Sequence, residues 1–205
     1  MSDYEQARAE LLEAELELMH QRERVATQRR ALPPGPLVED YRFGSADGEV
    51  RLSELFGGAE RPLAVYHFMF GKRQTEPCPM CSMWVDGWNA VANHLARNLD
   101  LVLATAAPVA ETEKMAAERG WGDLRWVSAA DNGFKADIGG EDADGNQSPF
   151  LSVYRLDDGR PRLTYSGGAH ISGEHWRGLD LLSPVWHFLD LTPDGRGDWM
   201  PSLAY

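Results

Sequence analysis

The chain contains two cysteines, and both lie in the segment Cys78-Pro79-Met80-Cys81, separated by only two residues. This spacing suits thiol–disulfide exchange, because one thiolate can attack a disulfide while the second thiol is close enough to resolve the mixed disulfide. We assign Cys78 as the nucleophile and Cys81 as the resolving thiol. The alternatives for such a pair are two inert cysteines in a hydrophobic core and two ligands of a metal ion.

A structural zinc site needs two ligands beyond a single cysteine pair. Among the six histidines, His170 and His175 have the spacing of a zinc-ligand pair, although they lie far from the cysteines along the chain. Sequence alone leaves this alternative open, but we predict no metal and no cofactor. His67 lies inside an apolar run, and we interpret it as a core histidine rather than a ligand.

The residues after Cys78 predict a helix that begins at the cysteine pair. Pro79 suits the first helical position, because its missing N–H would be unpaired there in any case. An apolar stripe at helical spacing follows, formed by Met80, Trp84, Trp88, Val91 and Leu95. Cys78 should therefore lie at a helix N-terminus, where free N–H groups stabilise a thiolate, and Lys72 and Arg73 can add positive charge nearby.

Strands and helices alternate around this helix. An apolar run over 63–70 predicts a central strand that is covered on both faces, and residues 131–147 resemble an acidic, glycine-rich surface loop. The other predicted elements are short strands over 41–43 and 50–52, strands over 99–106 and 124–128, a helix over 108–119, a hairpin over 150–156 and 162–165, and helical segments over 176–182 and from Ser183 onward. The predicted fold class is α/β, with a sheet flanked by helices.

This order of elements is that of a thioredoxin-like domain in a peroxiredoxin-style variant, with an N-terminal helical extension. Residues 3–31 predict the extension, because Leu12, Leu16 and Met19 recur at helical spacing among many Glu and Arg residues. We divide the chain into a helical extension over 1–34 and a thioredoxin-like domain over 35–205. A single helix cannot bury a face by itself, so this one packs on its own domain or on a second copy in a homodimer.

Two further residues are candidates for the site by their position. Pro149 precedes the strand that begins at Phe150, where thioredoxin-like folds carry a cis proline that faces the cysteines; a proline that only begins a strand is the alternative. Thr75 lies three residues before Cys78, which is the T-x-x-C spacing of a peroxiredoxin peroxide site. The match is partial, because Gly71 stands where that pattern has a proline. We place both residues with the two cysteines in the predicted catalytic set.

Composition and charge narrow the classes of partner. The net charge of −12 argues against a nucleic acid or an anionic membrane surface. No apolar run is long enough to cross a membrane, and the first residues lack the features of a secretory signal, so we expect a cytoplasmic protein. Phosphate-binding glycine loops and serine-nucleophile motifs are absent from the sequence. The expected partners are a disulfide or peroxide substrate and an external thiol electron donor.

The sequence resembles a bacterial family of unknown function whose members are described as thioredoxin-like, predicted dithiol-disulfide oxidoreductases. The most specific part of the resemblance is the block Tyr66-His67-Phe68-Met69-Phe70 followed by Cys78-Pro79-Met80-Cys81-Ser82. The other matching segments, spread over nearly the whole chain, are Arg29-Arg30-Ala31-Leu32-Pro33, Tyr41 with Phe43, Leu52-Ser53-Glu54-Leu55-Phe56, Gly120-Trp121, Gly178-Leu179-Asp180 and Leu189-Asp190-Leu191-Thr192-Pro193-Asp194-Gly195-Arg196. The resemblance implies a redox pair at Cys78 and Cys81 that faces Pro149.

Three functions follow as alternatives. The first is a thiol–disulfide oxidoreductase, and its direction stays open because thioredoxin has Gly-Pro where this chain has Pro-Met between the cysteines. The second is a thiol peroxidase, in which Cys78 becomes a sulfenic acid that condenses with Cys81. The third is a non-enzymatic binding protein on the same fold, which a Cys78 pKa near the ordinary value of about 8.5 would favour.

Overall fold

The structure, a computed structural model, describes residues 2–169, 178–195 and 197–204. The chain forms two compact units, Met1–Gly35 and Pro36–Tyr205. The histidines His170 and His175, which the zinc alternative requires, lie outside the described residues.

The first unit consists mainly of α1 (Asp3–Arg30), which confirms the predicted N-terminal helix. Its start is defined by a reciprocal cap: Glu5 N–H donates to the Ser2 hydroxyl, and Ser2 N–H donates to the Glu5 carboxylate. None of the residues of α1 is buried. That this helix packs on its own domain or on a second copy stays a prediction. No described helix is both long enough and apolar enough to span a membrane.

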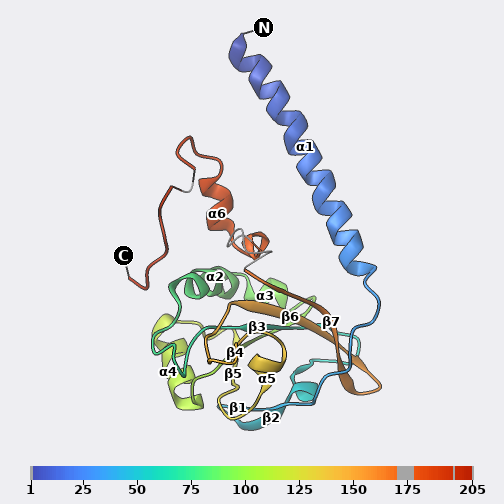
Figure 1. The fold of residues 1–205 in the computed structure, drawn as a ribbon, viewed down its shortest axis with the longest axis vertical. Coiled ribbons are helices and arrows are strands. Elements are labelled where there is room, and N and C mark those ends of the chain that lie inside the picture. Colours follow the sequence, from blue (N-terminus) through green and yellow to red (C-terminus); the bar gives the residue numbers. More distant parts are fainter. Residues whose placement is uncertain (1, 170–177, 196, 205) are drawn as a thin grey trace. The chain divides into compact units, whose positions relative to one another are not determined.

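The second unit is built on a seven-stranded sheet with the strand order β2-β1-β5-β4-β3-β6-β7 (Figure 1). The strands are β1 (Arg42–Ser45), β2 (Gly48–Arg51), β3 (Leu63–His67), β4 (Asp100–Thr105), β5 (Arg125–Ser128), β6 (Phe150–Asp157) and β7 (Arg160–Gly168). The neighbours β3, β4 and β5 run parallel, and the other pairings are antiparallel. The sequence therefore predicted correctly an α/β sheet with an added terminal hairpin.

The central strand β3 is shorter than the predicted run over 63–70. All of its residues are buried, as expected for a strand covered on both faces, but the strand ends at His67. The bond from Phe68 N–H to Ala104 O still continues the ladder with β4, but Ala106 N–H then donates to Phe70 O, while Phe68 O accepts from the Lys135 side chain. This departure begins the segment that leads to the cysteines.

The helices of the second unit cover both faces of the sheet. They are η1 (Leu52–Leu55), α2 (Pro79–Ala90), α3 (Ala92–Leu95), α4 (Val109–Arg119), α5 (Phe134–Asp137), η2 (Asp180–Leu182) and α6 (Pro184–Leu189). Strand residues alternate between the faces, so that Tyr66 packs with α2 and α4 while its neighbour Val65 packs with η1 and α5. The predicted helix after Pro108 is confirmed as α4, and the predicted helical segment over 176–182 lies partly outside the described residues.

One prediction about the fold was wrong. Residues 131–147 were expected to form a surface loop, but they contain α5, whose Phe134 and Lys135 are buried. The Phe134 ring packs edge-on against Tyr41 and Phe43, and it stacks on His67. Because this ring fills one face of the sheet, the segment is anchored in the core. His67 is a core histidine, as expected.

Candidate active site

The segment from β3 to α2 forms a tight turn that returns to the end of the sheet. Gly71 and Gln74 exchange two backbone hydrogen bonds of 2.7 and 3.0 Å, and Gly71 has a φ of +96°, which favours glycine. Cys78 N–H then donates to Met69 O at 3.1 Å. These bonds hold Cys78 at the N-cap of α2, with Pro79 at the start of the helix, as predicted.

The two thiols lie together at this helix start. Cys78 and Cys81 come within 3.5 Å of each other and form no disulfide; Cys78 is half-buried and Cys81 is fully buried. The Cys81 side chain, helped by the backbone N–H groups of Cys81 and Met80, lowers the pKa of Cys78 to about 6, although burial opposes this shift. Cys78 is therefore mainly a thiolate at neutral pH.

The second thiol has the opposite character. Burial raises the pKa of Cys81 well above its usual value, and the neighbouring Cys78 raises it further. The buried Tyr66 hydroxyl has no hydrogen-bond partner among the described residues. Burial raises the pKa of Tyr66 well above its usual value, and the nearby Cys81 raises it further. Cys81 thus keeps its proton while Cys78 is ionised, and this proton stabilises the Cys78 thiolate.

Substitution of Cys81 tests this origin of the low Cys78 pKa. We expect Cys81→Ala to move the Cys78 pKa from about 6 toward the unperturbed value of about 8.5, because the largest stabilising contact is lost. Cys81→Ser is the matched control, since its hydroxyl can still donate to the thiolate. The measurement is the rate of iodoacetamide alkylation of Cys78 as a function of pH. An inflection that stays near pH 6 in Cys81→Ala would show that the helix N–H groups set the Cys78 pKa without the Cys81 side chain.

The other two predicted site residues occupy different environments. Pro149 is buried immediately before β6, and its carbonyl accepts a hydrogen bond from Ala169 N–H. Because His67 pairs with Phe150, Pro149 lies at the same end of the sheet as the segment that leads to the cysteines. Its peptide bond is trans, since the described residues contain no cis bond. Thr75 is exposed on the turn before Cys78. That either residue takes part in catalysis stays a prediction.

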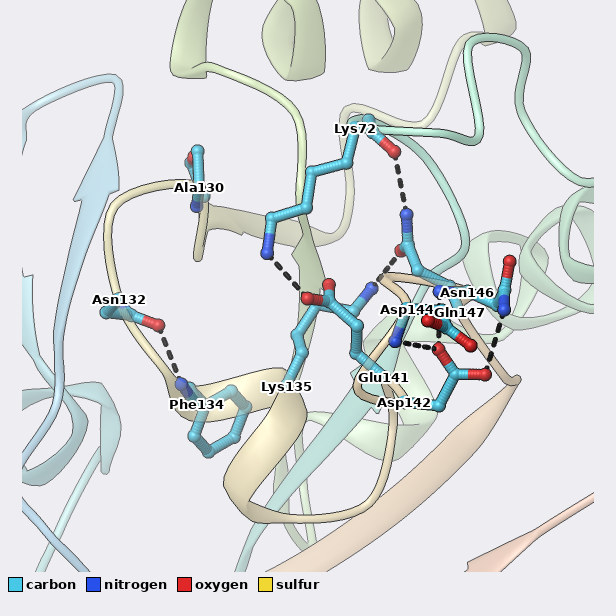
Figure 2. Close-up of polar contacts among 12 residues, drawn as sticks. Lys72, Ala130, Asn132, Phe134, Lys135, Glu141, Asp142, Asp144, Asn146 and Gln147 are labelled. Atoms are coloured by element: carbon cyan, nitrogen blue, oxygen red, sulfur yellow. Dashed lines mark hydrogen bonds and ion pairs between the residues drawn. The ribbon is translucent and has the colours of Figure 1, made fainter.

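Lys135, a buried polar residue beside the site, was not predicted from the sequence. Lys135 Nζ, on α5, donates to Phe68 O in the segment that leads to the cysteines and to Gln147 Oε1 in the loop before β6. Nearby, Lys72 pairs with Glu141 at 2.7 Å (Figure 2). Lys72 was expected to support the thiolate, but its ammonium group is engaged by this carboxylate. The spacing of Phe134 and Ile138, four residues apart, was the available signal that Lys135 lies on a helical turn packed against the core.

A half-buried thiolate at the head of a helix that follows a central strand, with a second thiol one turn later, defines a dithiol site on a thioredoxin-like fold. The chain belongs to the family described as "Bacterial protein of unknown function (DUF899)", whose model matches residues 1–204. A comparison with curated proteins finds no match.

Solved structures share the fold. The peroxidoxin BcpB from Mycobacterium tuberculosis is 18% identical, with a TM-score of 0.54, over 71% of this chain and 90% of that chain. Reduced Prx3 from Vibrio vulnificus is 11% identical, with a TM-score of 0.54, over 74% and 96% of the two chains. Peroxiredoxin Q from Xanthomonas campestris is 13% identical, with a TM-score of 0.52, over 72% and 92%. At these identities the similarities establish the thioredoxin-like, peroxiredoxin-style fold, and they carry no activity over to this chain.

Proposed function

We propose that the protein is a thiol–disulfide oxidoreductase that works through Cys78 and Cys81. The observation that carries the proposal is the approach of the half-buried Cys78 thiol and the buried Cys81 thiol to 3.5 Å at the start of a helix. The Cys78 thiolate attacks a substrate disulfide, forms a mixed disulfide and releases one substrate thiolate. Cys81 then attacks the Cys78 sulfur, which forms the internal disulfide and releases the second substrate thiolate. An external thiol donor returns the pair to the dithiol.

The difference in burial supports this order of events. A substrate disulfide can reach the half-buried Cys78, whereas the fully buried Cys81 is accessible only to the sulfur already attached to Cys78. A low pKa also suits the first attack, because the thiolate is the reactive form. We propose a reducing compartment, the cytoplasm, as its location, because the dithiol must be regenerated there. The test is reduction of a disulfide substrate by the wild-type protein and by Cys78→Ser.

A thiol peroxidase is the second candidate, because several solved structures with this fold are peroxiredoxins by name. In that reaction the Cys78 thiolate would attack a peroxide oxygen and become a sulfenic acid, with release of water or an alcohol. The Cys81 thiol would then condense with it and release water, which gives the same internal disulfide. The two candidates therefore differ in the oxidised substrate and not in the product state of the protein.

Substitution of Thr75 distinguishes the thiol–disulfide oxidoreductase from the thiol peroxidase. Its side chain is exposed, so we expect Thr75→Val to leave the rate of disulfide reduction unchanged. A peroxide site of the T-x-x-C type needs the hydroxyl, and the same substitution would then slow peroxide consumption. Both rates are measured on one preparation, with wild-type protein as the reference. Peroxide consumption by the wild type that exceeds that of a free thiol, and that falls in Thr75→Val, would favour the peroxidase.

A further inference from the structure

The stretch of chain between β3 and the turn that precedes the cysteines is held at each of its carbonyl groups. The carbonyls of residues 68–71 all accept hydrogen bonds, although the strand itself has ended. Cys78 N–H donates to Met69 O at 3.1 Å. Ala106 N–H donates to Phe70 O at 2.8 Å. The first and the last carbonyl of this stretch accept from side chains that come from a distant part of the sequence.

Lys135 and Gln147 provide these two side chains, and we call the pair the clamp. Lys135 Nζ donates to Phe68 O at 2.7 Å. Gln147 Nε2 donates to Gly71 O at 2.8 Å. Lys135 Nζ also donates to Gln147 Oε1 at 2.6 Å, so the two side chains form one connected unit (Figure 2). Both residues are buried, and an unpaired polar group at this depth is unfavourable, so the clamp and the two carbonyls depend on each other.

The loop that carries Gln147 is closed by its own contacts. Glu141 and Gln147 form an isolated antiparallel bridge across it. Within the loop, Asp142 Oδ1 accepts hydrogen bonds from Asp144 N–H at 3.0 Å and from Asn146 N–H at 2.8 Å (Figure 2). Gln147 therefore extends from a loop that is closed on itself, and its partner in the clamp extends from the short helix α5. The clamp thus rests on backbone that lies outside the cysteine segment.

Cys78 is the residue whose placement depends on this stretch of chain. It is the N-cap of α2 and has an extended backbone, with a ψ of 124°, so the regular geometry of the helix does not by itself fix its position. Cys81, by contrast, lies inside the helix and is fully buried. The bond from Cys78 N–H to Met69 O lies between the two carbonyls that the clamp holds. The clamp therefore determines where Cys78 lies relative to Cys81.

Resting on the dithiol function proposed above, we propose that Lys135 and Gln147 are positioning residues that hold Cys78 in line for the attack by Cys81. In this resolving step the Cys81 sulfur bonds to the Cys78 sulfur, and the bond from Cys78 to the substrate sulfur breaks. Over the whole step the Cys81 proton passes to the departing substrate thiolate, so atoms and charge balance. Such an attack needs aligned sulfur atoms, and a displacement of about 1 Å costs about a hundredfold in rate. The first attack needs only an accessible thiolate, so the clamp acts on the second step.

A chromogenic aromatic disulfide separates the two steps, because attack by Cys78 releases one coloured thiolate and attack by Cys81 releases the other. We expect Lys135→Met to slow the second release by about tenfold to a hundredfold and to leave the first release within about threefold of the wild type. Gln147→Leu changes no charge and should have the same effect, because the clamp needs both side chains. A wild-type ratio of second to first release in either variant would overturn the proposal.

The double variant tests whether the two side chains act as one unit. Since Lys135 and Gln147 are bound to each other, the double variant should slow the second release no more than the slower single variant does. Effects that multiply would mean two independent contributions and would contradict a single clamp. Lys114→Met is the matched control, because it removes an exposed ammonium group on α4 and should keep both rates. A slower second release in this control would assign the effect to the lost charge instead of the clamp.

Amide hydrogen exchange of the resting dithiol protein gives a readout that needs no turnover. Loss of the clamp should speed the exchange of Cys78 N–H by about tenfold or more, because its bond to Met69 O loosens. Exchange of Val85 N–H, inside α2, should stay at the wild-type rate. Equal acceleration at both amides would indicate a general loss of stability and would count against a positioning role, as would unchanged protection of Cys78 N–H. If the wild type releases only one thiolate, the dithiol function fails, whereas this exchange measurement still tests the clamp.

Discussion

Replacement of Cys78 by serine is expected to abolish disulfide reduction, with a loss on the order of a thousandfold or more. The thiolate is the attacking group, and a serine hydroxyl stays protonated at a pH where Cys78, with its pKa of about 6, is ionised. The measurement is the reduction of a disulfide substrate in the presence of a dithiol donor. The wild-type rate of the first attack should rise with pH through about 6 and then level off. Equal rates for the wild type and Cys78→Ser would remove the proposed function.

The matched control is Cys81→Ser, which keeps the nucleophile but lacks the resolving thiol. This variant should attack the substrate once and stop as a mixed disulfide on Cys78, which intact-mass measurement detects as an added substrate thiol. Addition of excess external thiol should release it. If the adduct appears instead on Cys81 in Cys78→Ser, the roles of the two cysteines are reversed. The pair of variants thus tests the order of attack as well as the activity.

Gly71→Ala is expected to cause the largest loss of stability, more than about 4 kcal/mol in the free energy of unfolding. A Cβ at this position would lie 2.1 Å from Ala107 N and 2.3 Å from Ala106 C, and neither backbone atom can move without disturbing the end of β4. The backbone is also left-handed here, with a φ of +96°. Urea unfolding of the wild type and the variant measures the difference.

Gly120→Ala is the control for the left-handed backbone alone. Gly120 has a φ of +72°, but an added Cβ would meet nothing within 4 Å, so we expect a loss of only about 1–2 kcal/mol. The difference between the two variants isolates the steric contact at Gly71. Similar losses for both would mean that the segment after β3 can shift away from β4. In that case the turn would not hold Cys78 as rigidly as its hydrogen bonds indicate.

Local rules explain why the cysteine helix could be predicted. The apolar run before the pair, Pro79 at the helix start and the apolar stripe that follows each act within a few residues, and the structure places β3 and α2 accordingly. The sequence predicts a Cys78 thiolate that is stabilised by the helix N-terminus and nearby positive charge, whereas the largest cause of its low pKa is the Cys81 side chain. The end of β3 was harder to place, because it depends on the bond from Ala106 N–H to Phe70 O, whose donor follows the neighbouring strand β4.

The burial of Lys135 could not be predicted by rules that act within a few residues of the chain. A lysine in an acidic, glycine-rich segment is normally exposed, so its burial runs against the ordinary behaviour of this residue type. Its carbonyl partner belongs to Phe68, 67 residues earlier in the chain, and this contact exists only once α5 has packed on the sheet. Thr75 shows a second limit. Its spacing of three residues from Cys78 gives its place in the sequence but does not determine whether its side chain is buried, and the side chain is exposed.

Because α1 buries no residue, optical signals differ in whether they report on the unit Pro36–Tyr205 alone. All seven tryptophans follow residue 35 in the sequence, whereas α1 is the longest helix and contains none. Because α1 buries no residue, its helicity rests on local backbone bonds and should fade gradually on heating instead of melting cooperatively. Far-ultraviolet circular dichroism therefore reports on α1 and on the unit Pro36–Tyr205 together in the full chain. Tryptophan emission follows Pro36–Tyr205 alone, and it is the signal from which unfolding energies of site variants should be read.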